Sequence, residues 1–140
     1  MTDLEMNAMI RVTILFEYCK RSFDASDNPE MHFYVIPELR DVDNEIIKVN
    51  AVHLIDENLV RGGVDDDGAQ TFPWIRRVTP TGMELVQRLT DESEFAIIEL
   101  HDRLKDKTNS RDKILECITY CLESEKFPAA VLNVAKNIVL

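Results

Sequence analysis

Hydrophobic residues in the first part of the chain recur at three- and four-residue spacings and predict a helix over residues 4–19. This segment contains neither Gly nor Pro, and its run VTILFEYC (residues 12–19) is apolar around most of a helical circumference. Such a helix is expected to be buried on more than one side. Residues 21–30 then have the Ser, Asp, Asn and Pro content of a loop, and MHFYVI (residues 31–36) predicts a short strand that Pro37 ends.

A second helical pattern covers residues 38–57 and contains two adjacent apolar lines. One line consists of Val42, Ile46, Val49 and His53, and the other of Ile47, Ala51 and Leu54. Asn58 follows where a left-handed residue closes a helix, a position at which Asn substitutes for Gly. His53 lies on an apolar line, so we interpret it as a partly buried core residue.

The segment after Asn58 has the pattern of a β hairpin followed by a helix. Leu59 and Val60 begin one strand, TFPWIRRVT (residues 71–79) forms the other, and RGGVDDDGAQ between them contains an Asp67-Gly68 turn pair. Pro73 within the second strand indicates an edge position. Thr79 or Thr81 can cap the next helix, which we expect to reach about Leu89.

Three further helical stretches are expected in the tail. The first covers residues 91–106 and opens with the capping pattern of Asp91 and Glu94, and the second is capped by Ser110. The last begins at Pro128 and turns Val131, Ala135 and Ile138 to one face. The predicted division is therefore a domain over residues 1–90 and a helical extension over residues 91–140.

The order of elements is helix, strand, helix, strand, turn, strand, helix, and residues 43–94 resemble winged-helix domains. The residues that carry the resemblance are LIDENLV (54–60), a Gly-containing turn, and WIRRVTPTGMELVQRLTDESEF (74–95). They are similar to a group of bacterial and phage-associated winged-helix proteins of unknown function. The resemblance implies an α+β, mostly α fold in which the hairpin is the wing, followed here by a C-terminal helical extension. It also implies core positions at Leu54, Leu59, Val60, Ile75, Val78, Leu85 and Leu89.

Charge and cysteine content narrow the functional classes. The formal net charge is −10, which repels nucleic acid and anionic membranes overall. No apolar run is long enough for a membrane span, and the acidic N-terminus does not match a signal peptide. Three cysteines without a framework pattern fit a reducing compartment, so we expect a cytoplasmic protein.

The helix that would enter a DNA groove is itself acidic. Residues 38–57 contain Arg40 and Lys48 but six acids, and the wing carries Asp65, Asp66 and Asp67 at its tip. The favoured hypothesis is therefore contact with a protein that has a basic face, in regulation or assembly. Its predicted contact residues are Asp41, Asp43, Glu45, Lys48, Asp65, Asp66, Asp67, Arg76 and Arg77.

Two alternatives stay open. A dimeric DNA-binding regulator would place Lys48, Arg61, Arg76 and Arg77 on phosphates and Asn44 or Asn50 near bases. It requires Lys20, Arg21, Arg61, Arg76, Arg77 and Arg88 to share one face without acids. A mimic of DNA would instead need acidic rows spaced like phosphates.

Catalytic, metal and cofactor sites are not expected. The three histidines are isolated in sequence, Gly68 does not fit a calcium loop because Gly63 and Trp74 stand where acids are required, and Cys117 and Cys121 have no further ligand pair nearby. We interpret these cysteines as buried. The apolar closing run AAVLNVAKNIVL and the first helix leave two alternatives, packing on the same core or homodimerisation through the first helix and residues 91–140.

Overall fold

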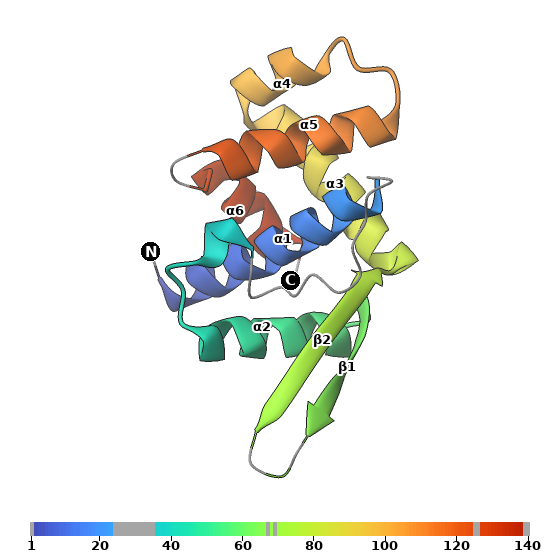
Figure 1. Ribbon diagram of the computed structural model, residues 1–140. Helices are drawn as coiled ribbons and strands as arrows, with labels where there is room; N and C mark the ends of the chain where they lie inside the picture. Colours follow the sequence, from blue (N-terminus) through green and yellow to red (C-terminus); the bar gives the residue numbers. More distant parts are fainter. Residues whose placement is uncertain (1, 24–35, 67, 69, 125–126, 139–140) are drawn as a thin grey trace.

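The computed structural model describes residues 2–23, 36–66, 68, 70–124 and 127–138, and these form an α+β, mostly helical fold (Figure 1). The elements follow the chain as α1 (Asp3–Ser22), the 3-10 turn η2 (Pro37–Leu39), α2 (Asn44–Asp56), β1 (Val60–Asp66), β2 (Thr71–Val78), α3 (Pro80–Ala96), α4 (Ile98–Leu104), α5 (Ser110–Glu123) and α6 (Ala129–Asn137). The strand expected at residues 31–36 lies outside the described residues, apart from Ile36, which is buried.

Helix α1 is the central element and confirms the prediction of burial on more than one side. It runs through the middle of the molecule, with α2 and the hairpin on one side and α3, α5 and α6 on the other (Figure 1). Five consecutive residues from Val12 to Phe16 are buried, which is possible only for a helix covered around its circumference. The helix begins where Thr2 Oγ1 accepts a hydrogen bond from Glu5 N at 3.1 Å.

Helix α2 starts later than predicted, and it turns only one of its two predicted apolar lines toward the core. Asp43 caps it by accepting from Glu45 N at 2.8 Å, so residues 38–43 belong to the 3-10 turn and the following loop. Asn58 adopts the predicted left-handed conformation, with φ of 58°. The buried face is Ile47, Asn50, Ala51 and Leu54, whereas Ile46 and Val49 of the other predicted apolar line are exposed.

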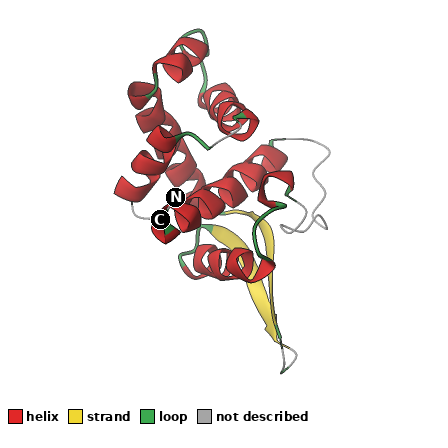
Figure 2. Ribbon diagram, turned by 90° about the vertical axis from the view of Figure 1, so that its left-hand side faces the viewer, coloured by secondary structure: helices red, strands yellow, loops and turns green. Residues whose placement is uncertain are grey.

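The hairpin of β1 and β2 is a two-stranded antiparallel sheet that projects from the helical body (Figures 1 and 2). Val60 pairs with Val78 at its buried base, and the register shifts by one residue between Arg61 and Gly62, which places Arg76 in a bulge. Within the described part of the chain both strands are edges, as Pro73 in β2 indicated. The Asp67-Gly68 turn lies partly outside the described residues, although Gly68 itself has a positive φ of 88°.

One junction ties α2, the hairpin and α3 together. Thr79 Oγ1 donates to Asn58 O at 2.6 Å and accepts from Gly82 N at 3.0 Å, which confirms Thr79 as a cap. Thr79 N donates to Leu59 O at 3.1 Å. Gly82 sits so close to Leu59 that a Cβ atom would overlap its carbonyl oxygen. Only glycine therefore allows the first turn of α3 to pack against this backbone.

The helices of the tail begin at different places from those predicted. Helix α3 continues across residues 90 and 91 to Ala96, so Asp91 and Glu94 are mid-helix residues and not a capping pair. Their pattern is overridden because Leu89, Thr90 and Ser93 are buried and keep the helix in one piece. Helix α5 is capped by Asn109, whose Oδ1 accepts from Asp112 N at 2.8 Å, and not by Ser110.

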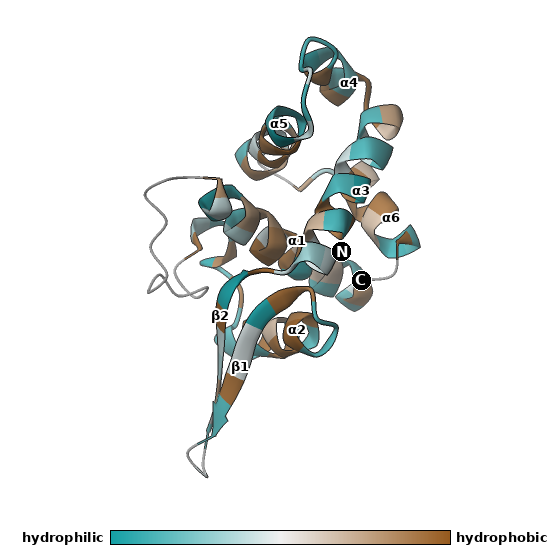
Figure 3. Cartoon of the chain, turned by 90° about the vertical axis from the view of Figure 1, so that its right-hand side faces the viewer, coloured by the Kyte–Doolittle hydropathy of each residue, from teal (hydrophilic) through white to brown (hydrophobic). Residues whose placement is uncertain are grey.

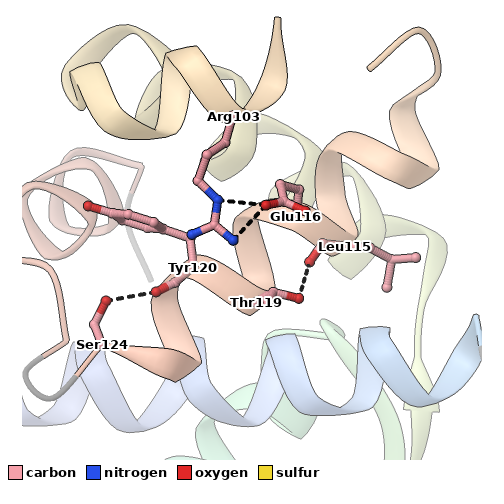
Figure 4. A network of polar contacts seen from close by, with 6 residues as sticks. All are labelled: Arg103, Leu115, Glu116, Thr119, Tyr120 and Ser124. Atoms are coloured by element: carbon pink, nitrogen blue, oxygen red, sulfur yellow. Dashed lines mark hydrogen bonds and ion pairs between the residues drawn. The ribbon is translucent and has the colours of Figure 1, made fainter. Parts of the chain in front are cut away.

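The tail packs on the same hydrophobic core as α1. Cys117 and Ile118 of α5 and Val131, Ala135 and Ile138 of α6 are buried in the core that contains Phe16. Helices α4 and α5 are joined at the surface by Arg103, which donates from Nε to Glu116 Oε1 at 2.6 Å and lies over the Tyr120 ring (Figure 4). The buried residues among 129–138 of the apolar closing run are thus covered within one chain, and α3 crosses the predicted division at residues 90 and 91.

None of the helices within the described ranges is long and apolar enough to cross a membrane.

We predict that Gly82→Ala lowers the free energy of unfolding by about 2–4 kcal/mol, because overpacking against backbone cannot be relieved by a rotamer change. Thr81→Ala, an exposed neighbour in the same turn, serves as the control and is expected to change stability by less than about 0.5 kcal/mol. Urea unfolding followed by circular dichroism measures both. Equal stability of the two variants would contradict the close approach of α3 to Leu59.

Candidate functional site

The candidate site is the outer face of α2 together with the hairpin that lies along it, here called the α2–hairpin surface. Helix α2 packs its inner face on α1 and runs beside both strands (Figure 1). Its outer face carries Glu45, Val49 and Asp56, all exposed. The site is therefore built on a rigid helix whose other side is part of the core.

Exposed apolar side chains gather on these elements. Eight large apolar side chains are exposed among the described residues, and five of them belong to α2 or the hairpin: Ile46, Val49, Val64, Phe72 and Trp74. Val49 is 65% exposed at the middle of the outer face of α2. In Figure 3 the ribbon of α2 is mostly hydrophobic in colour, whereas β1 alternates between hydrophobic, neutral and hydrophilic segments. Aromatic and apolar residues clustered at a surface are typical of contact sites.

Phe72 and Trp74 are functional candidates that sequence reasoning missed. The segment TFPWI is apolar at successive positions, so its alternation did not reveal which side chains face outward. The structure buries Pro73 and Ile75 and leaves Phe72 and Trp74 about two-fifths exposed.

Lys48 connects the helix to the hairpin. Its Nζ lies 3.2 Å from Glu45 Oε1 and 5.5 Å from the centre of the Phe72 ring. The ammonium group is thus occupied by a carboxylate and an aromatic face, and its side chain is only 19% exposed. A phosphate would have to displace these two contacts.

The predicted acidic residues that the structure describes are exposed, and two of them have local structural roles. Asp43 caps α2, and Asp66 Oδ1 accepts from Gly68 N at 3.0 Å and so holds the hairpin turn. Asp41 and Asp65 are exposed, whereas Asp67 lies outside the described residues. The exposed acids thus form two groups, one on or beside α2 and the other at the far end of β1.

Three arginines gather at the base of the hairpin. Arg61 and Arg77 are directly opposite each other in the register, and Arg76 occupies the adjacent bulge. All three are exposed, and no ion pair involves them among the described residues. Like charges directly opposite destabilise a sheet, so an anionic group bound here would relieve repulsion.

The structure does not assemble the continuous basic face that the DNA hypothesis required. Arg21 is buried, with its guanidinium 3.5 Å from Glu17 Oε1 and over the Tyr18 ring. Arg88 pairs with Glu92 at 3.2 Å. Two of the six expected cations are thus neutralised within the fold.

Asn50 is corrected from a candidate base contact to a core residue. It is completely buried, accepts from Arg11 Nε at 2.8 Å, and donates to Asn7 Oδ1 at 3.1 Å and Ile46 O at 2.9 Å. All of its amide hydrogen-bonding groups are used between α1 and α2. Asn44, by contrast, is exposed in the first turn of α2.

The cysteines are buried as expected, and the described residues contain no group of three or more His, Cys, Asp or Glu arranged to hold a metal ion. Burial raises the pKa of the Cys19 thiol to about 12. The thiols of Cys117 and Cys121 are hydrogen-bonded to each other, and this bond together with burial keeps the pKa of Cys121 above its ordinary value.

His53 is half-buried on α2, and its Nε2 atom is inaccessible to solvent without a hydrogen-bond partner in the described part of the chain. Burial lowers the pKa of His53, and the nearby Arg11 guanidinium lowers it further, while Glu57 and Asp56 act in the opposite direction. The neutral imidazole is therefore the form that the folded protein favours.

We predict that the protein loses stability as pH falls from about 7.5 to 5.5, since the unfolded chain binds a proton at His53 near pH 6.5 before the folded one does. His53→Gln removes this contribution, so the variant should show a flatter pH dependence of the urea midpoint. The carboxylates and the other histidines are present in both proteins, so their contributions to the pH dependence cancel in the comparison. Identical pH dependence of both proteins would contradict the lowered pKa.

The α2–hairpin surface thus combines an exposed aliphatic centre, two aromatic rings, carboxylates on the helix and arginines at the hairpin base. This composition is suited to recognition. The chain matches no protein-family model, no curated protein and no solved structure.

Proposed function

We propose that the chain is a non-enzymatic winged-helix protein of the cytoplasm that acts through protein–protein contacts in a regulatory or assembly role. The winged-helix assignment is supported by the order of α2, the β1–β2 hairpin and α3, and by the Thr79 junction that joins them. The α2–hairpin surface is its contact face, with α2 in the position of a groove-reading helix and the hairpin as the wing.

The observation that carries this proposal is the exposure of Val49. A helix that reads DNA needs donors and cations on its outer face, yet here the middle of that face is an aliphatic side chain between Glu45 and Asp56. Burying Val49 against another protein removes apolar surface from water, which is the main driving force for association.

The charges define the partner. Asp41, Asp43, Glu45, Asp56 and Glu57 are exposed on or beside α2, so a contacting surface with Lys or Arg side chains is electrostatically favoured. Lys48 does not oppose it because Glu45 already neutralises its charge. A basic face with an apolar centre is therefore the chemistry that fits.

A dimeric DNA-binding regulator is the second candidate, and the unpaired arginines favour it. Arg61, Arg76 and Arg77 can hold phosphate oxygens, while Lys48 would have to leave Glu45 and Phe72 to do the same. In such a complex the acids of α2 would face the phosphate backbone of the DNA and weaken binding.

A homodimer through the first helix and residues 91–140 is a separate prediction. Apart from Leu4, which is exposed, the large apolar residues of α1 and of the described part of α6 are at least partly covered by the chain itself. This leaves Phe95 and Ile98 as the exposed large apolar side chains of the described tail, at 89% and 80% exposure. A dimer formed by the tail would therefore use the α3–α4 corner.

We predict that Val49→Asp abolishes capture of the physiological partner in a quantitative affinity pull-down from the native cell extract. Leu4→Asp provides a matched control, because Leu4 is 66% exposed at the far end of α1. This substitution also replaces an exposed aliphatic side chain by an acid. Proteins retained by wild type and Leu4→Asp but lost with Val49→Asp identify the partner. Partners retained equally by all three proteins would overturn the assignment of this surface.

For duplex DNA we expect no binding that weakens steeply between about 50 and 200 mM salt, measured by fluorescence anisotropy with labelled random duplex. The second candidate would instead be established if the affinity for DNA depended steeply on salt and the double variant Arg61→Ala/Arg77→Ala removed this dependence. Lys105→Ala/Lys107→Ala is the control for a loss of two exposed positive charges elsewhere.

A further inference from the structure

A cleft of about 840 Å³ lies on the opposite side of α1 from the hairpin, between α1, the η2 turn, the end of α5 and the start of α6. No residue of the α2–hairpin surface contributes to it, apart from the acidic side chain of Asp41 at its rim. The volume is within the range of pockets that hold small organic molecules, roughly 300–1,000 Å³.

The floor of the cleft is apolar, and its few polar groups are already hydrogen-bonded. It is lined by Met9, Thr13, Cys121, Leu122, Phe127 and Leu132. Thr13 Oγ1 donates to Met9 Sδ at 3.7 Å, and the hydroxyl of the adjacent lining residue Ser124 donates to Tyr120 O at 2.7 Å (Figure 4). The hydrogen bond with Cys117, together with burial, raises the pKa of the Cys121 thiol, which therefore stays neutral. The side chains of the floor thus offer no spare donor to an anion.

The rim carries an excess of carboxylates. Among the described residues, Glu5, Glu38 and Asp41 line it together with a single cation, Arg40, whose Nε lies 4.0 Å from Asp41 Oδ2. Glu38 takes part in no ion pair among the described residues. Three acids beside a low-dielectric floor produce a negative potential at the mouth of the cleft, which attracts cations and repels anions.

We propose that this cleft binds a small amphiphilic cation, with its apolar body on the Met9, Leu122, Phe127 and Leu132 side chains and its ammonium group at the carboxylates of Glu38 and Asp41. The floor supplies apolar contact without competing polar groups, and the rim supplies acceptors that a protonated amine satisfies as a donor. The cleft shares only Asp41 with the proposed protein contact, because neither Val49 nor the hairpin lines it.

The test is a titration of the chain with n-hexylammonium followed by NMR of ¹³C-labelled methionine methyl groups. Met9 lines the cleft, whereas Met83 lies against Cys19 near the other end of α1 and serves as an internal reference. Ligand is added to about 10 mM, because fragments of this size bind in the millimolar range. We expect saturable shifts of the Met9 methyl and none of Met83.

Charge selectivity is measured with 1-hexanol and hexanoate, which keep the apolar body and change the head group. Hexylammonium should bind more tightly than hexanol, and hexanoate least. The double variant Glu38→Gln/Asp41→Asn should weaken the binding of hexylammonium by about fivefold, as expected for the loss of two exposed carboxylates. Its affinity for hexanol should be unchanged. Glu84→Gln/Asp102→Asn, which removes two exposed acids that do not line the cleft, should preserve hexylammonium binding.

Three results would overturn the proposal. They are no Met9 shift with any ligand, equal affinity for hexylammonium and hexanol, and the same loss of affinity in the rim and control variants. Retained hexanol binding by the rim variant shows that the variant is folded, so loss of cation affinity cannot be attributed to unfolding.

Discussion

The structure depends on the burial of α1 around its whole circumference. Because consecutive residues from Val12 to Phe16 are apolar or buried, no single neighbouring layer can cover the helix. Helix α2 and the hairpin cover one side, and α3, α5 and α6 cover the other (Figure 1). This constraint explains why the tail is part of the core. It also explains why two surfaces, the α2–hairpin surface and the cleft beside η2, lie on different sides of the same helix.

A second constraint fixes the geometry of the α2–hairpin surface. The Thr79 hydroxyl accepts from the start of α3 and donates to the end of α2, and Gly82 brings α3 against the backbone of Leu59. The hairpin leaves this junction with its direction set by buried Val60 and Val78 at its base. The exposed side chains of α2 and the hairpin are therefore held in a fixed relation by backbone contacts far from the surface itself.

The acidic side chains have different surroundings at the α2–hairpin surface and at the cleft. On α2 the acids surround an exposed aliphatic residue, which favours a basic protein face, whereas at the cleft they surround a concave apolar floor, which favours a small cation. The arginines at the hairpin base are the exception, since Arg61 and Arg77 oppose each other and neither forms an ion pair among the described residues. A partner that places Lys or Arg on α2 and a carboxylate at Arg61 and Arg77 would satisfy both charges of the surface at once.

The sequence by itself determined the features that depend on neighbours along the chain. The all-round apolar first helix, the left-handed Asn58, a threonine cap at Thr79 or Thr81, and the inward face of α6 follow from local spacing and backbone chemistry. Only the tertiary structure decided which apolar line of α2 turns inward, because the partners of Asn50 come from α1, 39 and 43 positions earlier. Likewise, because Leu89, Thr90 and Ser93 are buried, α3 continues through the Asp91/Glu94 pattern, which by local sequence alone would begin a new helix. The cleft joins residues from both ends of the chain, and no periodicity within one segment contains that information.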